Sequence, residues 1–211
     1  RGALGGTPAM TPAAATRCTG GCGELPQGFG LADPGPAKSA MARVLNGESV
    51  ALSGEAPWLD EAGYPLARDG SVRIAATPRR GDAVEADLVY HPKTLVAGIG
   101  CERGVTASEV YGLLTSTMAD QGLATESLAA IASIDIKDDE HALNELAARL
   151  NVPLRLFSAK QLAEEEARLV TPSEVVRAET GTPGVAEAAA LKAGTLIVPK
   201  RRSARATCAI G

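Results

Sequence analysis

The amino-acid sequence predicts an α/β protein in which residues 93–211 form a three-layer α/β/α domain with a largely parallel or mixed sheet. A small strand-rich segment is expected before it. From residue 94 onward, apolar runs of strand length alternate with segments of helical period, which is the pattern of layered α/β domains. The 211 residues are 45% hydrophobic, enough for one such domain and a smaller companion.

The chain before residue 93 divides into two segments. Residues 1–36 are rich in Gly, Ala, Thr and Pro and show no lasting period, so we expect a loose N-terminal remnant or linker. Residues 37–92 are expected to form a small segment with one helix and short strands. The predicted helix spans 36–46, and the predicted strands span 49–53, 72–77 and 84–90. Alternating polarity in the last strand is typical of a strand with one solvated face.

The predicted large domain begins with a buried strand at 95–99. Thr106 and Glu109 then indicate a capping box, in which the threonine hydroxyl accepts from the Glu109 amide and the Glu109 carboxylate reaches back. This box opens a predicted helix at 106–120. A strand at 128–135 and a helix at 139–150 follow.

The remaining elements are also read from local signals. A strand at 153–157 leads into a second capping box, formed by Ser158 and Gln161. Thr182 is expected to cap a helix that has Pro183 at its first position and runs to Gly194. The apolar runs TLIVP and ARATCAI flank the basic turn KRRS, which predicts a hairpin at the C-terminal end.

Composition narrows the classes of function. A net charge of −4 and only 3% aromatic residues argue against nucleic acid as a partner. No apolar run approaches the roughly 18 residues that a bilayer span needs, so no membrane partner is expected. The chain begins at Arg1 without a signal pattern, which suggests a piece of a longer product or a truncated chain. We expect a cytoplasmic protein.

The four cysteines are Cys18, Cys22, Cys101 and Cys208. A zinc site at the first two would lack half its ligands, so the cysteines are interpreted as free thiols of a reducing compartment. We therefore expect no metal and no cofactor.

The segment TLVAGIGCERGVTASEV, residues 94–110, indicates a strand, a glycine-rich turn and a helix start. Gly98, Gly100 and Gly104 are expected to free the backbone, so that amides and the helix dipole attract a carboxylate or phosphate. A dinucleotide-binding turn is an alternative. However, the glycine spacing is one residue too long and the acidic residue at Asp135 comes too late for the ribose.

Four segments together resemble the cobalamin-biosynthesis family called CbiG or CobE. They are GIGCERG at 98–104, ASIDIKDDE at 132–140, TGTPGVAEAAAL at 180–191 and VPKRRSARATCAI at 198–210. Residues 24–52 resemble the middle segment of that family, and residues 3–14 resemble the end of its N-terminal domain. Two departures are Glu102, where a basic residue is usual, and Thr11–Ala15, which lacks a hydroxyl and a carboxylate of a family motif.

The resemblance implies an anionic cobalt-tetrapyrrole (precorrin) intermediate as ligand and other cobalamin-pathway enzymes as partners. Anaerobic members are cobalt-precorrin-5A hydrolases, which open a δ-lactone with water and release acetaldehyde. Other relatives consist of little more than this domain, or are fused to precorrin-3B methyltransferase. Binding of the intermediate without catalysis is therefore the alternative function.

The candidate general bases are Asp135 and Glu187, with a helix cap and a helix surface as their structural alternatives. The candidate substrate-binding residues are Gly98, Gly100, Cys101, Arg103, Gly104, Ser133, Lys137, Gly181, Thr182 and Lys200. Cys101 is also a conceivable nucleophile, although packing under the turn is the commoner role of such a cysteine. Lys200, with Arg201, Arg202 and Arg205, has a solvated turn as its alternative. Because carboxyl ends of parallel strands share one edge, these segments are expected to converge on one crevice.

Overall fold

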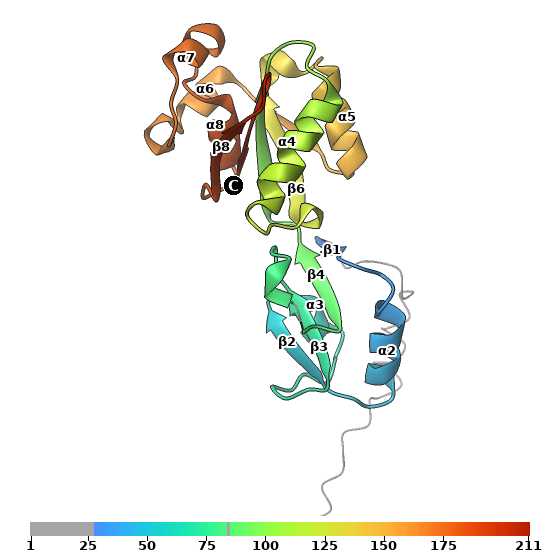
Figure 1. Ribbon diagram of the computed structural model, residues 1–211. Helices are drawn as coiled ribbons and strands as arrows, with labels where there is room; N and C mark the ends of the chain where they lie inside the picture. The colour runs from blue at the N-terminus through green and yellow to red at the C-terminus, as the bar shows by residue number, and fades with distance from the viewer. Residues whose placement is uncertain (1–27, 84) are drawn as a thin grey trace, which may run out of the picture. The chain divides into compact units, whose positions relative to one another are not determined.

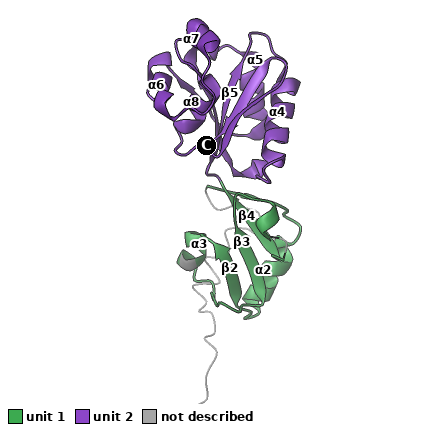
Figure 2. Ribbon diagram, turned by 60° about the vertical axis from the view of Figure 1, so that its left-hand side comes forward, with its two compact units in different colours: residues 1–92 green, residues 93–211 purple. Residues whose placement is uncertain are grey.

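The structure is a computed structural model that describes residues 28–83 and 85–211. The chain divides into two compact units, one ending at Pro92 and the other spanning Lys93–Gly211 (Figures 1 and 2). Each unit has its own sheet and its own hydrophobic core. None of the helices in the described ranges is long and apolar enough to span a bilayer.

The second unit is built on a five-stranded mixed sheet in the order β7-β6-β5-β9-β8. The strands are β5 (Leu95–Cys101), β6 (Leu128–Ile134), β7 (Leu154–Phe157), β8 (Val198–Arg202) and β9 (Ala206–Ile210). The first three are parallel, whereas β9 runs antiparallel to both β5 and β8. The terminal hairpin thus enters the sheet beside the first strand of the unit.

Helices cover both faces of this sheet (Figure 1). On one face lie α4 (Ala107–Ala119) and α5 (His141–Leu150), and on the other lie α6 (Ala159–Ala163) and α8 (Val185–Leu191), with α7 (Glu174–Thr180) beyond them. Leu114, Met118 and Leu143 fill the first interface, and Ala188 and Ala189 fill the second. The predicted three-layer α/β fold class is confirmed.

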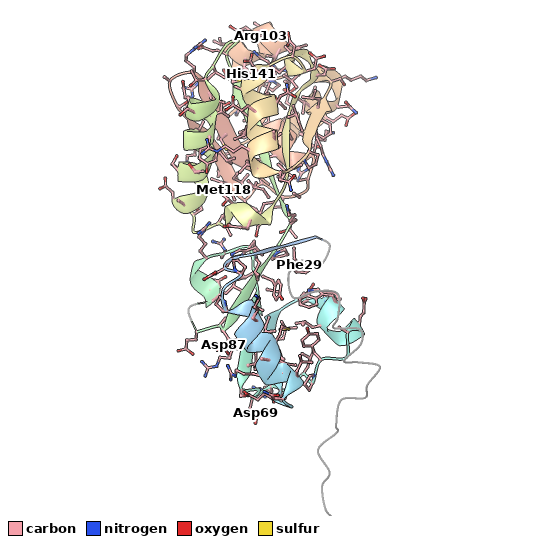
Figure 3. The ribbon with its side chains drawn as sticks, turned by 90° about the vertical axis from the view of Figure 1, so that its right-hand side faces the viewer. Phe29, Asp69, Asp87, Arg103, Met118 and His141 are labelled. Atoms are coloured by element: carbon pink, nitrogen blue, oxygen red, sulfur yellow. The ribbon has the colours of Figure 1, made fainter. Side chains whose placement is uncertain are left out.

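Labelled residues mark the two ends of this unit and differ in burial. Figure 3 shows Arg103 and His141 at one end of the unit and Met118 at the opposite end of α4. Met118 is fully buried, whereas Arg103 is exposed. The first of these ends is the one at which the parallel strands β5 and β6 finish.

The first unit has a four-stranded sheet in the order β1-β4-β3-β2. Its elements are β1 (Phe29–Leu31), α2 (Ala37–Leu45), β2 (Val50–Gly54), α3 (Pro57–Glu61), β3 (Val72–Ala76) and β4 (Leu88–Pro92). Strands β2, β3 and β4 are parallel, and β1 pairs antiparallel with β4. Phe29, Trp58 and Tyr90 meet edge to face within one apolar cluster that also contains residues of α2 and α3.

Three predictions for the first unit are wrong. Residues 37–92 contain a second helix, α3, beside the single helix that is expected there. Residues 29–31, expected to be loose, form β1, because Phe29 finds aromatic partners far away in the sequence. The strand predicted from residue 84 begins only at Leu88, because a turn closed by the Ala86 amide on the Ala83 carbonyl precedes it. Val84 itself lies outside the described residues.

The capping predictions of the second unit have mixed outcomes. Ser158 and Gln161 form the predicted capping box at α6. The Thr106 hydroxyl accepts from the Glu109 amide at 3.2 Å, but the Glu109 carboxylate does not reach back. It accepts instead from the Ser203 hydroxyl at 2.6 Å and the Arg205 amide at 2.8 Å. This carboxylate therefore ties α4 to the turn of the terminal hairpin.

The predicted helix start at Thr182 is also wrong. Helix α8 begins at Val185 with Gly184 as its N-cap, and it ends at Leu191, before Gly194. A separate helix that the sequence does not predict, α7, precedes it and ends at Thr180, with Gly181 as its C-cap. Thr182 falls between the two helices, where its hydroxyl is buried without a hydrogen-bond partner in the described structure.

Candidate ligand-binding site

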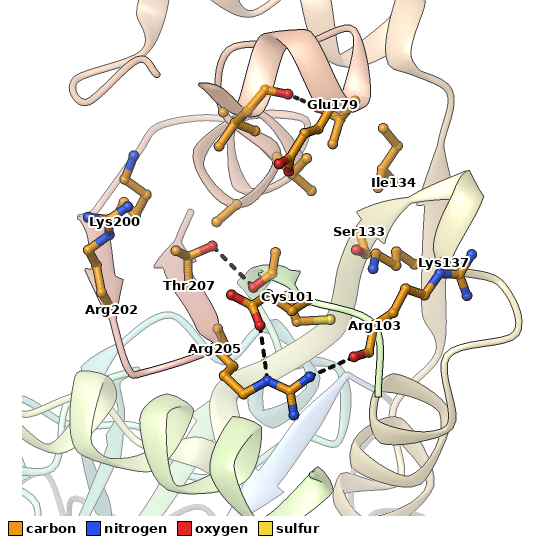
Figure 4. Close-up of a pocket in the computed structure, with 18 of the residues that line it drawn as sticks. Cys101, Arg103, Ser133, Ile134, Lys137, Glu179, Lys200, Arg202, Arg205 and Thr207 are labelled. Atoms are coloured by element: carbon orange, nitrogen blue, oxygen red, sulfur yellow. Dashed lines mark hydrogen bonds and ion pairs between the residues drawn. The ribbon is translucent and has the colours of Figure 1, made fainter. Parts of the chain in front are cut away.

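A cavity of about 710 Å³ lies in the second unit, at the edge where β5 and β6 end (Figure 4). Its wall comes from the ends of these two strands, from α7 and the start of α8, and from the β8–β9 hairpin. The lining residues are Gly100, Cys101, Glu102, Arg103, Ser133, Ile134, Ile136, Lys137, Val175, Val176, Glu179, Thr180, Gly184, Val185, Ala186, Lys200, Arg202, Ser203, Ala204, Arg205, Ala206 and Thr207. The expected convergence of separate segments at one sheet edge is present.

Cationic side chains outnumber carboxylates in this wall. The cations are Arg103, Lys137, Lys200, Arg202 and Arg205, and the carboxylates are Glu102 and Glu179. Figure 4 shows Lys200 and Arg202 on one side of the cavity and Arg103 and Lys137 on the other. The cavity therefore presents positive charge from two opposite walls, in a protein whose net charge is negative.

Arg205 joins two parts of this wall. Its guanidinium donates to a Glu102 carboxylate oxygen at 3.0 Å, and to the backbone carbonyls of Arg103 at 2.7 Å and Gly104 at 3.1 Å. The Glu102 amide donates in return to the Arg205 carbonyl at 2.9 Å. Glu102, the departure from the family pattern, thus anchors the hairpin arginine to the end of β5.

Two further cations have partners within the protein. Arg103 pairs with Asp139 and donates to the Ile136 carbonyl, which links the loop after β5 to the loop after β6. The Lys200 ammonium donates to the Thr171 carbonyl at 2.6 Å, and its burial lowers the pKa of this lysine. These contacts hold the wall in shape.

Lys137 and Arg202 differ from the other cations of the wall. Neither forms an ion pair with a carboxylate in the described structure. Lys137 is only 8% exposed, whereas Arg202 is exposed to solvent. Both charges are thus available to an anion that enters the cavity.

Two exposed aliphatic side chains belong to the cavity lining, and their exposure places them at its mouth. Ile136 is 48% exposed and Val175, on α7, is 71% exposed. Large aliphatic side chains lose little by exposure singly, but two at the mouth of one cavity offer apolar contact to a ligand. The wall therefore combines cations with an apolar rim.

The candidate residues are divided by this geometry. Those that line the cavity are Gly100, Cys101, Arg103, Ser133, Lys137 and Lys200. Those that lie outside the wall are Gly98, Gly104, Asp135, Gly181, Thr182 and Glu187. Gly181 is the left-handed C-cap of α7, with φ of 77°.

The glycine-rich turn at 98–104 differs from the prediction. Gly98 and Gly100 lie inside β5, opposite Ala209 and Thr207 of β9, so their amides belong to a strand and not to an open turn. Of the three glycines, only Gly104 has a left-handed conformation, with φ of 66°, and its amide donates to Glu140 at 3.3 Å. The N-terminus of α4 is not part of the cavity wall. Because Gly98 and Gly100 lie within β5, this segment does not form a dinucleotide-binding turn.

Close packing of a helix on β5 explains why residue 98 is a glycine. A Cβ atom at this position would lie 2.0 Å from the carbonyl oxygen of Ala186 and 2.7 Å from the amide nitrogen of Ala190. Helix α8, all of whose residues are buried, therefore rests directly on β5. This close approach brings the start of α8 to the cavity, so Gly98 shapes the wall without lining it.

Glu187 is buried, and its carboxylate is fully engaged. It accepts from the amides of Val170, Thr171 and Lys200, each at 2.9 Å, and from the Thr171 hydroxyl at 2.8 Å. Burial by itself would raise the pKa of Glu187, but these donors outweigh it and the pKa is lowered. The Glu187 carboxylate thereby links three elements: its own helix α8, the loop that precedes α7, and strand β8. It does not line the cavity.

Three other candidates have local roles. Asp135 is exposed and opens the 3₁₀ turn Asp135–Lys137, so it does not cap the helix at 141–150. Burial raises the pKa of the Cys101 thiol, which disfavours the thiolate that a nucleophile requires. The Ser133 hydroxyl donates to the Ile99 carbonyl at 2.8 Å and so fastens β6 to β5.

Several lining residues were outside the sequence-based set. The sequence predicts Arg202 and Arg205 only as neighbours of Lys200 in a basic turn, whereas Lys200 and Arg202 lie in strand β8. Thr207 and the α7 residues Val175 and Glu179 are not among the predicted site residues. The signal for α7 is nevertheless present. Ser173 caps the helix on the Val176 amide, and a glycine follows its last turn.

In the described part of the chain, no group of three or more His, Cys, Asp or Glu side chains is placed so that it could hold a metal ion. Cys18 and Cys22 lie outside the described residues, as does the Thr11–Ala15 segment. The cavity wall offers charge and apolar contact to its ligand.

Fold and site together define an α/β domain with a cationic cavity at the edge where its parallel strands end. Comparison with known families identifies this domain further. The chain belongs to the family described as cobalamin synthesis G C-terminus, whose model matches residues 95–211. The resemblance read from the four sequence segments is confirmed.

Individual relatives agree with this assignment. "Protein CobE" of Sinorhizobium sp. is 43% identical over 120 residues, which are 55% of this chain and 78% of that protein. "Cobalt-precorrin-5A hydrolase" of Priestia megaterium is 32% identical over 130 residues, which are 60% of this chain but only 34% of that protein. The chain thus matches about a third of the hydrolase.

A solved structure also resembles the second unit. The crystal structure of CobE, described as a protein from the cobalamin (vitamin B12) biosynthetic pathway, is similar with a TM-score of 0.53 and 40% sequence identity. The match covers 56% of this chain and 89% of that chain. The relatives place the chain in cobalamin biosynthesis.

Proposed function

We propose that the second unit binds an anionic cobalt-tetrapyrrole intermediate of cobalamin biosynthesis in the cavity at the end of β5 and β6. The observation that carries this proposal is the opposition of Lys137 and Arg202, two cations without an ion-pair partner in the described structure, across one cavity. Precorrin intermediates carry many carboxylates on an apolar ring. Such a ligand matches cationic walls with an apolar mouth.

The size of the cavity supports a small-molecule ligand. Its volume of about 710 Å³ lies within the range usual for ligand pockets. The relatives named CobE and cobalt-precorrin-5A hydrolase support the tetrapyrrole class. We infer a cytoplasmic site of action, beside the other enzymes of the pathway.

Hydrolysis of the δ-lactone of cobalt-precorrin 5A is the second candidate function, favoured by the hydrolase relatives. It requires a base for water. Asp135 and Glu187, the expected bases, lie outside the wall, and Glu102 is paired with Arg205. Glu179 on α7 is then the wall carboxylate left to activate a water, while one of the cations of the wall would polarise the lactone carbonyl.

The decisive experiment is anaerobic incubation of the protein with cobalt-precorrin 5A. Binding alone gives a saturable spectral shift without acetaldehyde, whereas hydrolysis releases acetaldehyde, and Glu179→Gln then abolishes the release but retains the shift. Absence of both signals would refute the proposed function.

The neighbouring arginines of β8 provide a matched control. Arg202 lines the cavity and Arg201 does not, although both are exposed. Arg202→Met should weaken binding about two- to fivefold, the typical loss of an exposed charge contact, and Arg201→Met should leave it unchanged. Equal losses in both variants would indicate non-specific charge attraction and contradict the cavity as the site.

A further inference from the structure

Lys137 combines two properties that rarely occur together. Its side chain is more than nine-tenths buried, and in the described structure its ammonium has neither a hydrogen-bond acceptor nor an ion-pair partner. Figure 4 shows the side chain extending from the end of β6 toward Ser133 and Cys101, at the inner end of the cavity. The nearby acidic groups are engaged elsewhere, since Asp139 pairs with Arg103 and Glu140 accepts from Gly104.

The aliphatic stem of Lys137 is covered, but its ammonium is not among the fully buried polar atoms that lack a partner, so the tip keeps contact with the solvent of the cavity. A carboxylate that reaches the ammonium displaces this solvent and supplies the charged partner that the described structure does not. The covered surroundings make the resulting pair stronger than one at the open protein surface. The exposed aliphatic side chains of Ile136 and Val175, which line the same cavity, would then contact the apolar body that bears this carboxylate.

We propose that Lys137 is the specificity-determining residue of the cavity, which selects a ligand that inserts one carboxylate to the inner end and leaves its ring at the apolar mouth. This inference rests on the proposed function and adds the ligand's orientation. It also assigns unequal roles to the cations: Lys137 receives the inserted carboxylate, and Arg202 meets a second one near solvent.

The test uses the full chain and two water-soluble porphyrins as probes. Uroporphyrin III carries eight carboxylates, and a tetracationic N-methylpyridyl porphyrin presents a similar ring with the opposite charge. Wild-type protein should bind uroporphyrin and not the cationic porphyrin. Lys137→Met should weaken uroporphyrin binding by about 30-fold or more, and Lys137→Arg should retain most of the affinity.

Thermal stability in the absence of ligand separates recognition from a structural role. Because the Lys137 ammonium makes no hydrogen bond or ion pair in the described structure, Lys137→Met should leave the melting temperature within about 2 °C of the wild-type value. Lys192 provides the matched control, since it is also largely covered but pairs with Glu164 at 2.7 Å and Glu165 at 3.2 Å. Lys192→Met should lower the melting temperature and leave porphyrin affinity unchanged.

The possible failures are distinguishable. If wild-type protein bound uroporphyrin and Lys137→Met bound it equally well, the inference would be wrong and the proposed function would stand. If wild-type protein bound neither cobalt-precorrin 5A nor uroporphyrin, the proposed function would be wrong, and the inference with it. A drop in the melting temperature of Lys137→Met would show a structural role and overturn the inference.

Chemical labelling of the unsubstituted protein gives a second readout that does not depend on a variant folding. Bound uroporphyrin should protect Lys137 from acetylation by an N-hydroxysuccinimide ester, as followed by mass spectrometry. Lys192, outside the cavity, should show no such protection. Equal labelling of Lys137 with and without saturating uroporphyrin would contradict the proposal.

Discussion

At the scale of single residues, Gly98 shows how one missing methyl group determines the distance between a helix and a strand. A Cβ atom there would overlap the Ala186 carbonyl oxygen, which belongs to a helix that is buried on all sides. Neither backbone can move away without disturbing the sheet or the core. The wall of the cavity depends on the same contact, because Gly100 and Ala186 both line it.

Gly98→Ala is therefore expected to destabilise the second unit by about 3 kcal/mol, at the upper end of the usual cost of overpacking. Urea unfolding followed by circular dichroism measures the change. Gly112→Ala is the matched control. Gly112 is exposed within α4 and has no neighbour within 4 Å of a new Cβ atom, so alanine should stabilise the helix by about 0.5–1 kcal/mol. Equal effects at both positions would refute the packing role of Gly98.

Glu187 leads to a prediction on pH. Its pKa in the folded protein lies below the ordinary value of 4.5, so its carboxylate stabilises the fold above that value. The contribution is lost as the pH falls through the lowered pKa. Glu187→Gln should cost about 2 kcal/mol of unfolding free energy at neutral pH, as expected for hydrogen bonds to a buried charge.

The cost of Glu187→Gln should shrink as the pH is lowered below 4.5, because the unfolded chain then takes up a proton that folded Glu187 accepts only at a lower pH. Urea unfolding of both proteins over a pH series measures the difference. A cost that stays constant down to the acid limit of the native state would show that the charge of Glu187 is not responsible.

At the scale of elements, α7 is held mainly by polar contacts. None of its residues is buried. Arg177 donates to both carboxylate oxygens of Glu166, at 3.0 and 2.6 Å, and also pairs with Glu174 of its own helix. Since Val175, Val176 and Glu179 of α7 line the cavity, part of the wall depends on this bidentate ion pair.

Arg177→Ala should loosen α7 selectively, because the helix has little apolar packing to replace the ion pair. Hydrogen exchange of amides 175–180 should become faster, while the melting temperature of the unit changes by less than about 2 °C. Arg168→Ala is the control, because it removes a nearby arginine that pairs with Glu165 instead. Unaltered exchange of α7 in Arg177→Ala would show that other contacts hold the helix.

At the scale of the whole molecule, the two units have separate cores. The apolar clusters on the two faces of the second sheet consist entirely of residues from the unit Lys93–Gly211, and the cluster of the first unit lies within Ala37–Tyr90 together with Phe29 and Leu31. The candidate site also lies wholly in the second unit. Cooperative unfolding requires a core of this kind, and each unit has one.

Residues 93–211 expressed alone should therefore unfold cooperatively, with a melting temperature close to that of one transition of the full chain. Differential scanning calorimetry of both proteins tests this. The isolated segment should also bind uroporphyrin as the full chain does. A segment that shows no cooperative transition would mean that the first unit contributes to its stability.

Local signals account for much of the agreement between sequence and structure. The apolar runs at 95–99, 128–135 and 153–157 became β5, β6 and β7, and Ser158 with Gln161 capped α6 as expected. Each of these signals depends only on residues that are close together in the sequence. The wrong predictions involve distant residues, because the carboxylate of Glu109 has its partners in a hairpin nearly a hundred residues away.

The sequence by itself determined the α/β class, the family and most of the order of strands and helices, apart from β1, α3 and α7, because periodicity, caps and motif segments are properties of neighbouring residues. Only the tertiary structure decided which candidates share a cavity. Arg205 meets Glu102 across 103 positions of sequence, and Glu187 turns away from the cavity toward amides of two other segments. The direction of a side chain depends on the partners that folding brings to it, and those partners lie far away along the chain.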